Sequence, residues 1–179
     1  VGREGVEIVY VKLDGQGRVD YKNLDVLLAA SGDKKTLVSL MHANNEIGTL
    51  LDLRKVSELC QQHNAFFHSD TVQTIGYNSF DLQQLKIHFL TGSAHKFHGP
   101  KGVGFVCINN EVSMHPFMDG GSQERNMRAG TENIYGIVGL GKALEICINQ
   151  MENYRSHIQG LKEYMKTNLM NAIPNIGFN

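Results

Sequence analysis

Short apolar runs alternate along this chain with longer segments in which apolar residues recur every three or four positions. The short runs predict strands, and the longer segments predict amphipathic helices. Strands are expected at residues 7–13, 36–41, 65–68, 89–93 and 103–108. Helices are expected at residues 20–30, 52–60, 81–86, 134–151 and 154–170, and a polar, glycine-containing loop at 120–130.

Aspartates stand where three of the predicted helices begin. Asp20, Asp52 and Asp81 can each accept hydrogen bonds from the free backbone N–H groups of a first helical turn. Strands and helices follow one another at short intervals, which predicts an α/β fold with a mostly parallel sheet flanked by helices. A domain boundary is expected only at 172–174, where the last helix ends.

Polar side chains collect where three successive strands end. In parallel sheets, ligands bind outside the carboxyl ends of the strands, where helix N-termini also favour anions such as phosphate. The residues at these strand ends are Asn44 and Asn45, then Asp70, then Ser93, His95 and Lys96. An amide, a carboxylate, a hydroxyl, an imidazole and an ammonium group at one edge indicate a binding site.

Composition narrows the choice of partners and location. The 179 residues carry a net charge of -1 with a pI near 6.8, so nothing suggests a nucleic-acid or membrane partner. No apolar run could span a bilayer and no signal peptide is visible. Three irregularly spaced cysteines give no disulfide framework, which favours the cytoplasm. The sequence starts at Val1, so we expect it to be part of a longer chain.

Asp70 and Lys96 form the central pair of this edge. Pyridoxal 5'-phosphate (PLP) enzymes need a lysine amine to hold the cofactor aldehyde as a Schiff base, and a carboxylate to keep the pyridine nitrogen protonated. An aspartate that caps a turn and a lysine on the surface would occupy the same positions. The spacing alone does not favour either interpretation.

Four motifs around this pair carry a family resemblance. Residues 93–102, Ser-Ala-His-Lys-Phe-His-Gly-Pro-Lys-Gly, resemble the lysine motif of class V aminotransferases, the family of cysteine desulfurases and selenocysteine lyases. Residues 44–48, 68–73 and 120–133 resemble three further motifs of that family, in the same order. The last motif points to the NifS-like desulfurase branch.

The resemblance implies a role for each matching residue. Lys96 would carry the cofactor as a Schiff base, and together with His95 it makes up the implied catalytic pair. Asp70 would pair with the pyridinium, and Gln73 would hydrogen-bond the phenolic oxygen of the ring.

The remaining implied ligands hold the phosphate and the substrate. Ser93 and His95 would bind the cofactor phosphate, and Asn45 would lie near the ring oxygen and the substrate carboxylate. Thr131 would reach the phosphate of a neighbouring subunit's cofactor, which implies a homodimer. Small departures from the family pattern leave the polar ligands in place: Ala94, Ser122 and Thr71 replace the usual glycine, glycine and alanine.

The resemblance also implies a fold and an activity. Residues 1–172 would belong to the large domain of a fold-type I PLP-dependent transferase, and 173–179 would start a C-terminal small domain. The activity would be that of a cysteine desulfurase, which takes sulfur from L-cysteine, leaves alanine and an enzyme persulfide, and passes sulfur to acceptor proteins, as in iron–sulfur cluster assembly. The family's upstream phosphate loop, ring-stacking histidine, acceptor cysteine and substrate arginine are absent from this sequence. Selenocysteine cleavage, another class V reaction, or a non-catalytic dimerisation scaffold are the alternatives.

Several chemically interesting residues also have plain structural interpretations. The three cysteines lie in apolar segments and are expected in the core: Cys60, Cys107 and Cys147. His95 and His98, with His68 and Asp70, could suggest a metal site, but no further ligands follow at a defined spacing, so no metal is expected. His68 should lie on the same face as Asp70 and support that carboxylate or pack near the cofactor.

Overall fold

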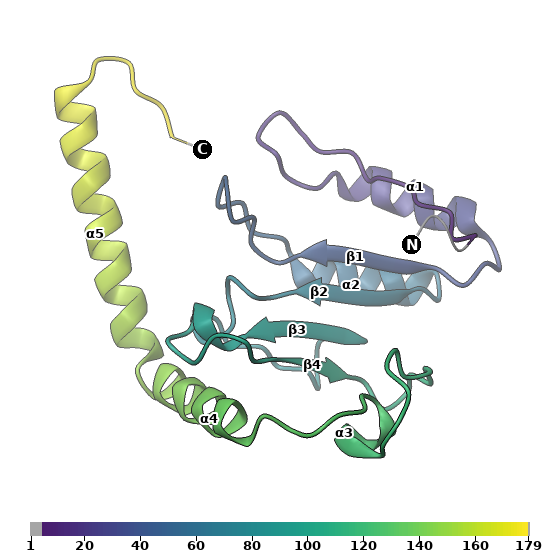
Figure 1. Cartoon of the computed structure of the whole chain (residues 1–179). Coiled ribbons are helices and arrows are strands. Elements are labelled where there is room, and N and C mark those ends of the chain that lie inside the picture. Colours follow the sequence, from purple (N-terminus) through teal and green to yellow (C-terminus); the bar gives the residue numbers. More distant parts are fainter. Residues whose placement is uncertain (1–4, 179) are drawn as a thin grey trace.

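A four-stranded sheet forms the centre of the computed structural model, which describes residues 5–178 (Figure 1). Its strands are β1 (Leu37–Met41), β2 (Phe66–Asp70), β3 (Phe89–Ser93) and β4 (Gly104–Ile108), adjacent in that order. β1, β2 and β3 are parallel, and β4 runs antiparallel to β3. The predicted α/β fold with a mostly parallel sheet is therefore confirmed. Residues 1–4 and 179, at the two ends of the predicted domains, lie outside the described residues.

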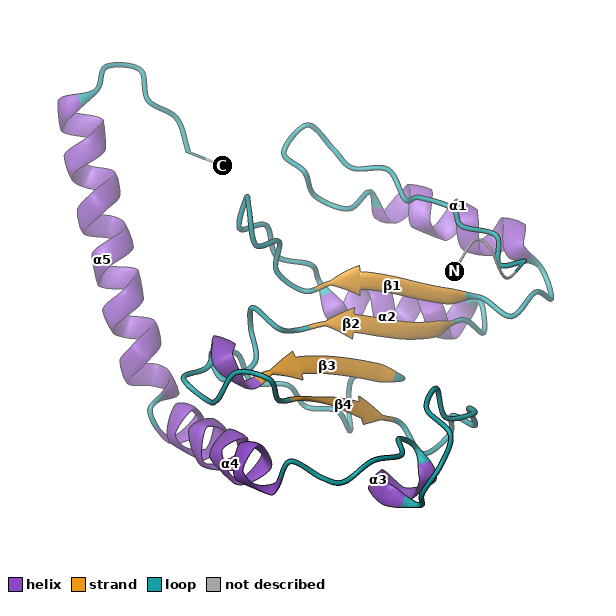
Figure 2. Ribbon diagram, viewed as in Figure 1, coloured by secondary structure: helices purple, strands orange, loops and turns teal. Residues whose placement is uncertain are grey.

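Helix α2 (Leu53–Gln62) packs on one face of the sheet, behind it in Figure 2, and α1 (Tyr21–Ser31) packs against α2 in the same core cluster. Both begin at their predicted caps. The Asp20 carboxylate accepts hydrogen bonds from the backbone of the first turn of α1, and Asp52 does the same for α2. Such caps stabilise a helix by about 1 kcal/mol each.

The main core lies between this face and α2. Val56 and Cys60 of α2 and Phe67 of β2 are completely buried there, and Val38 and Leu90 extend the core over β1 and β3. The opposite face carries residues of the alternate register, including His68, Asp70 and Thr91, and no described helix packs across it (Figure 2). Apolar residues on this open face stay largely exposed: Leu37, Met41 and Val106.

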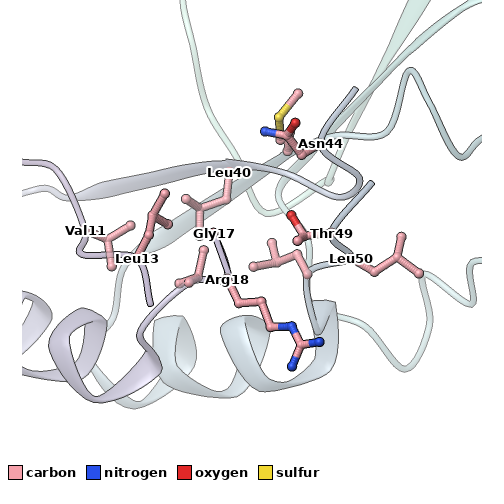
Figure 3. A pocket seen from close by; sticks show the side chains of 11 residues that line it. Val11, Leu13, Gly17, Arg18, Leu40, Asn44, Thr49 and Leu50 are labelled. Carbon is pink, nitrogen blue, oxygen red and sulfur yellow. The ribbon is translucent and has the colours of Figure 1, made fainter. Parts of the chain in front are cut away.

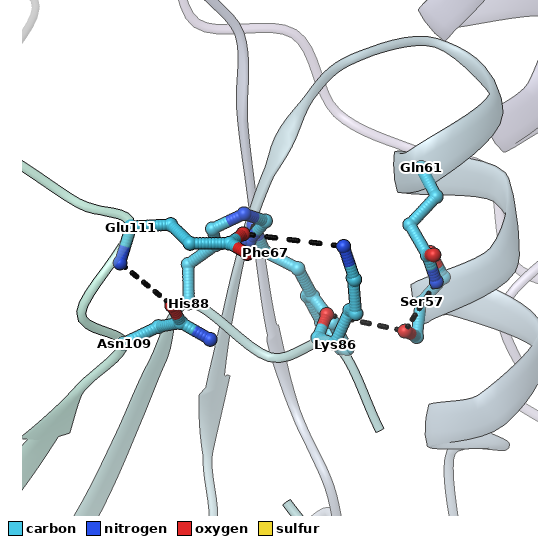
Figure 4. A network of polar contacts seen from close by, with 7 residues as sticks. All are labelled: Ser57, Gln61, Phe67, Lys86, His88, Asn109 and Glu111. Carbon is cyan, nitrogen blue, oxygen red and sulfur yellow. Dashed lines mark hydrogen bonds and ion pairs between the residues drawn. The ribbon is translucent and has the colours of Figure 1, made fainter. Parts of the chain in front are cut away.

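A polar network joins the core layer to the end of the sheet where β2 and β3 begin (Figure 4). The backbone N–H of Phe67 donates to Nδ1 of His88 over 3.0 Å, and the Ser57 hydroxyl donates to the Lys86 carbonyl over 3.1 Å. Partial burial lowers the pKa of His88. A neutral His88 can accept the Phe67 bond through a lone pair, so the network and the pKa shift agree.

Two helices, α4 (Ile134–Asn149) and α5 (Met151–Ala172), end the chain with the predicted break between them. α4 contributes Ala143 and Cys147 to a second core cluster, while α5 has no buried residue and extends away from the sheet (Figure 1). The predicted loop at 120–130 holds one short turn, α3 (Gln123–Asn126), whose central residues have positive φ.

Two predicted elements are wrong. Residues 7–13 form no strand, because no neighbouring strand pairs with them beyond one isolated bridge between Leu13 and Val19. Val6, Ile8 and Val9 remain more than half exposed there. Residues 81–86 form only a turn, in which the Asp81 side chain accepts a bond from the Gln83 N–H and the helix does not continue.

Candidate functional site

The parallel order of β1, β2 and β3 brings their carboxyl ends to one edge of the sheet (Figure 1). Asp70 is the last residue of β2, and its neighbours across the strands are Met41 on β1 and Thr91 on β3. Ser93 ends β3, and Lys96 follows in the short 3-10 helix η2 (Ala94–Lys96). The structure thus brings the predicted carboxylate and the predicted lysine to the same edge on adjacent strands.

Two backbone N–H groups hold Asp70, one at its carbonyl and one at its carboxylate. Its carbonyl accepts a hydrogen bond from the His42 N–H over 2.8 Å, which extends the pairing beyond the end of β1. Its Oδ1 accepts a bond from the Val72 N–H over 2.9 Å. No described residue donates a hydrogen bond to Oδ2, so this oxygen is available to a ligand.

Gln73 lies in the turn that follows Asp70, and Thr71 fastens this turn to β3. Thr71 is completely buried, and its backbone N–H and its hydroxyl both donate to the Thr91 carbonyl, over 3.1 and 2.8 Å. The hydroxyl at this departure from the family pattern therefore has a structural function that alanine could not supply. It holds the segment that carries half-buried Gln73 against the neighbouring strand.

The lysine loop is anchored by the residue after Lys96. Phe97 is completely buried in the second core cluster, and the Phe97 and Gly99 N–H groups both donate to the Ala94 carbonyl, over 3.1 and 2.8 Å. A Cβ at Gly99 would lie 2.9 Å from the Ala94 Cβ, so only glycine permits this approach. Lys96 stays exposed on a loop whose base is closed and buried.

His98 closes the same loop from the other side. It has a φ of 67°, a conformation that is uncommon for residues other than glycine. Its Nε2 lies 3.1 Å from the Tyr77 hydroxyl, and its ring makes edge contacts with Tyr77 and Tyr154. These contacts occupy His98 structurally and leave Lys96 as the free group of the loop.

Ser93 and His95 are joined directly, with the serine hydroxyl 2.9 Å from Nδ1 of His95. His95 is exposed and Ser93 is half-buried. One proton of this pair, which stands one to three residues before Lys96, is used in the mutual bond, and the other can be donated to an anion.

Asn44 and Asn45 lie in the turn after β1, and they do different things. Oδ1 of Asn44 accepts bonds from the Glu46 and Ile47 N–H groups, so this side chain shapes the turn. Asn45 is exposed, and its amide donates to a Glu46 carboxylate oxygen over 2.6 Å. Asn45 is therefore the one of the pair that could turn toward a ligand.

A pocket of about 150 Å³ lies beside this turn (Figure 3). Apolar side chains such as Val11 and Leu40 line it, with Asn44 and Arg18 at its polar side. None of the seven predicted ligands lines it, so it is separate from the Asp70–Lys96 edge.

Thr131 is the one predicted ligand that the structure does not bring to this edge. It is exposed in the loop before α4, where the next-but-one residue, Asn133, caps the helix by accepting the Gly136 N–H over 3.1 Å. No hydrogen bond within residues 5–178 joins Thr131 to the other six predicted ligands.

The cysteines divide into two buried and one exposed. Burial raises the pKa of the Cys60 thiol to about 12, and the Cys147 thiol donates to the Phe97 carbonyl over 3.4 Å. The prediction that Cys107 is a core residue is wrong, because it lies on β4 at the edge of the sheet, where it remains exposed. Across residues 5–178 no three potential metal ligands gather, and no helix has the length and apolarity to cross a membrane.

The residues that hold the site were not predicted from the sequence. Phe97 stands inside the lysine motif without a predicted function, but it is the anchor of the lysine loop. His42 was not singled out, although its Nδ1 lies 2.9 Å from the Thr74 hydroxyl in the turn that carries Gln73. The signal available in the sequence was an apolar aromatic residue inside a mostly polar motif, and Phe97 is such a residue.

The donor set fits PLP. A primary amine stands on a rigid loop, a carboxylate with one open oxygen ends the adjacent strand, and a hydroxyl–imidazole pair suited to an anion precedes the amine. These are the groups that a pyridinium, an aldehyde and a phosphate require.

Comparison with known proteins agrees with the fold. The model of the family Aminotransferase class-V matches residues 1–179. Cysteine desulfurase IscS from Dictyoglomus turgidum is 40% identical over 175 residues, which are 98% of this chain and 44% of that protein. A cysteine desulfurase from Sinorhizobium fredii is 42% identical over 172 residues, covering 96% of this chain and 44% of its own length.

Solved structures of NifS-like proteins also match nearly the whole chain. A NifS-like protein superimposes with a TM-score of 0.88 and 38% identity, covering 95% of this chain and 46% of the other. A NifS-like protein from Rickettsia africae also gives a TM-score of 0.88, at 34% identity. The chain spans less than half the length of these relatives. Because the family model covers every residue, the chain belongs to the class-V aminotransferase family.

Proposed function

We propose that this chain is the cofactor-lysine part of a PLP-dependent cysteine desulfurase that takes sulfur from L-cysteine. The observation that carries the proposal is the exposed Lys96, on a loop anchored by the buried Phe97, at the same sheet edge as the Asp70 carboxylate oxygen to which no described residue donates. Relatives named cysteine desulfurase at about 40% identity over nearly the whole chain support the choice of reaction within the family.

Each site residue has a proposed task at the edge. Lys96 would hold the cofactor, and Asp70 would bind its ring nitrogen through the carboxylate oxygen that no described residue occupies. Gln73, on the turn fastened by Thr71, would donate to the ring oxygen. When bound, PLP supplies an electron-withdrawing ring that stabilises negative charge on the α-carbon of an amino acid.

Other residues would bind the charged ends of cofactor and substrate. The joined side chains of Ser93 and His95 would donate to the phosphate, and His95 would also be close enough to Lys96 to act with it in catalysis. Asn45 would release Glu46 and orient the substrate carboxylate. Thr131 is exposed, and no hydrogen bond within residues 5–178 joins it to the other six predicted ligands, which supports its proposed contact with the cofactor of a second subunit in a homodimer.

The organisation of the protein is part of the same proposal. Residues 1–172 would belong to a large PLP-binding domain, and 173–179 would begin a small domain, because α5 ends at Ala172. A cytoplasmic location is supported by three free cysteines. Sulfur-acceptor proteins would be its partners.

Borohydride reduction after incubation with PLP, followed by peptide mass mapping, tests the proposal in the complete polypeptide that carries this chain. We expect one pyridoxyl adduct, on Lys96, and its loss in Lys96→Ala. Lys101→Ala, an exposed lysine of the same loop region, is the matched control and should label as wild type. Adducts scattered over many lysines, or labelling that survives Lys96→Ala, would refute the cofactor assignment. Formation of alanine from L-cysteine then tests the reaction.

A further inference from the structure

A row of three side chains crosses the open face of the sheet beneath the proposed cofactor edge. Ser39 on β1, His68 on β2 and Thr91 on β3 form this hydroxyl–imidazole–hydroxyl row. The Ser39 hydroxyl lies 2.8 Å from Nδ1 of His68, and the Thr91 hydroxyl lies 3.3 Å from Nε2. Both ring nitrogens are therefore engaged, each by a different neighbouring strand.

The row sits next to Asp70. His68 and Asp70 are two residues apart on β2, so their side chains leave the same face of the sheet about 7 Å apart along the strand. Thr91 is the cross-strand partner of Asp70, while its hydroxyl reaches diagonally to His68. The hydroxyl of the residue that pairs with Asp70 across the strands thus contacts the imidazole.

Burial lowers the pKa of His68, and the negative charge of Asp70 opposes this shift as the smaller effect. His68 is accordingly neutral near pH 7. A neutral imidazole with one N–H and one lone pair is matched by two hydroxyls, which can each donate or accept.

We propose that His68, held by Ser39 and Thr91, is a positioning residue that reserves the open carboxylate oxygen of Asp70 for the ring nitrogen of the cofactor. The row engages two groups on the same face as that oxygen: the Thr91 hydroxyl is bonded to His68, and the imidazole carries no charge. It also joins β1, β2 and β3 on the face that bears Asp70, which fixes the direction of the carboxylate. This inference rests on the proposed function.

Three variants test it in the complete polypeptide: Ser39→Ala, Thr91→Val and His68→Leu. Loss of a hydrogen bond that braces a ligand group should weaken PLP binding about 3- to 10-fold, and His68→Leu should weaken it at least as much. Because Asp70 sets the electronic state of the bound ring, the absorption maximum of the bound cofactor should move as well. His68→Asn, which can keep the contact to Ser39, should restore part of the affinity.

Thr36→Val is the matched control, since it makes the same substitution as Thr91→Val where the hydroxyl bonds only the Lys34 carbonyl. It should leave affinity and absorption unchanged. Melting temperature without PLP reports a purely structural function. If Thr91→Val and Ser39→Ala bind PLP with wild-type affinity and an unmoved absorption maximum, or if they change only the melting temperature, the inference is wrong. If the wild type itself takes up no PLP on Lys96, the proposed function fails instead.

Discussion

Replacing Phe97 by alanine should uncouple the lysine loop from the body of the protein. Phe97 is completely buried in the second core cluster, whose other buried members, Ala94, Ala143 and Cys147, are small. Small buried neighbours fill little of the space that a phenyl ring leaves, although larger partly buried side chains pack around the cluster. The cost should therefore lie within the range of about 3 to 5 kcal/mol measured for Phe→Ala in cores, near 4 kcal/mol.

The area removed from water gives a similar figure. A buried phenylalanine side chain removes roughly 150 to 200 Å² from solvent, which at about 25 cal/mol/Å² is about 4 to 5 kcal/mol. Such a loss is a large fraction of the free energy of unfolding of a typical domain, about 5 to 15 kcal/mol. The substitution should also make the Lys96 loop more mobile, because that loop would lose its buried anchor, Phe97.

Urea unfolding followed by circular dichroism measures the stability, and PLP labelling of Lys96 measures the loop. Phe117→Ala is the matched control, because Phe117 is 97% exposed and its loss should change stability by about 0.5 kcal/mol or less. If Phe97→Ala costs less than about 1 kcal/mol, or no more than Phe117→Ala, Phe97 does not anchor the loop. A stability loss without any change in Lys96 labelling would show that the anchor and the lysine are independent.

Two further predictions concern thiols and pH. Cys107 should react with iodoacetamide in the native protein, whereas the buried Cys60, with a pKa of about 12, and Cys147 should react only on unfolding. Mass spectrometry over time measures the labelling. Rapid labelling of Cys60 would contradict its burial. Burial holds the pKa of His42 below its ordinary value of 6.5, so the unfolded chain binds a proton more readily and stability should fall as pH drops below 6.5. The free energy of unfolding should fall by up to about 1.4 kcal/mol per pH unit because of this group. Urea midpoints at about pH 7.5 and about pH 5.5 measure the fall. The explanation is refuted if these midpoints differ as much in a His42→Gln variant as in the wild type.

Local signals predicted much of this fold. Asp20 and Asp52 begin helices as expected, because a cap depends on a few adjacent residues. The strand at 7–13 failed because alternation shows only that a segment can pair, whereas a strand needs a neighbour. Asp81 supplied a cap, but the following residues did not pack as a helix, so only a turn formed.

The positions of the proposed ligands in the fold could be predicted, whereas the residues that support them could not. Asp70, Ser93 and Lys96 were placed at one edge because parallel strands end together. The row through His68 depends on register across three strands, since Thr91 pairs with Asp70 yet bonds to His68. No spacing along a single segment contains that information.

The helix α5 has a consequence for how this protein opens in solution. Its 22 residues extend over about 33 Å and bury no side chain, so its backbone bonds are supported mainly by exposed pairs such as Glu152–Arg155 and Glu163–Lys166. Such pairs add only a few tenths of a kcal/mol each. The amide hydrogens of α5 should therefore exchange with deuterium through local fraying, long before those of β2 exchange through global unfolding. Wherever α5 docks in the complete polypeptide, slowed exchange along it would map the docked surface turn by turn.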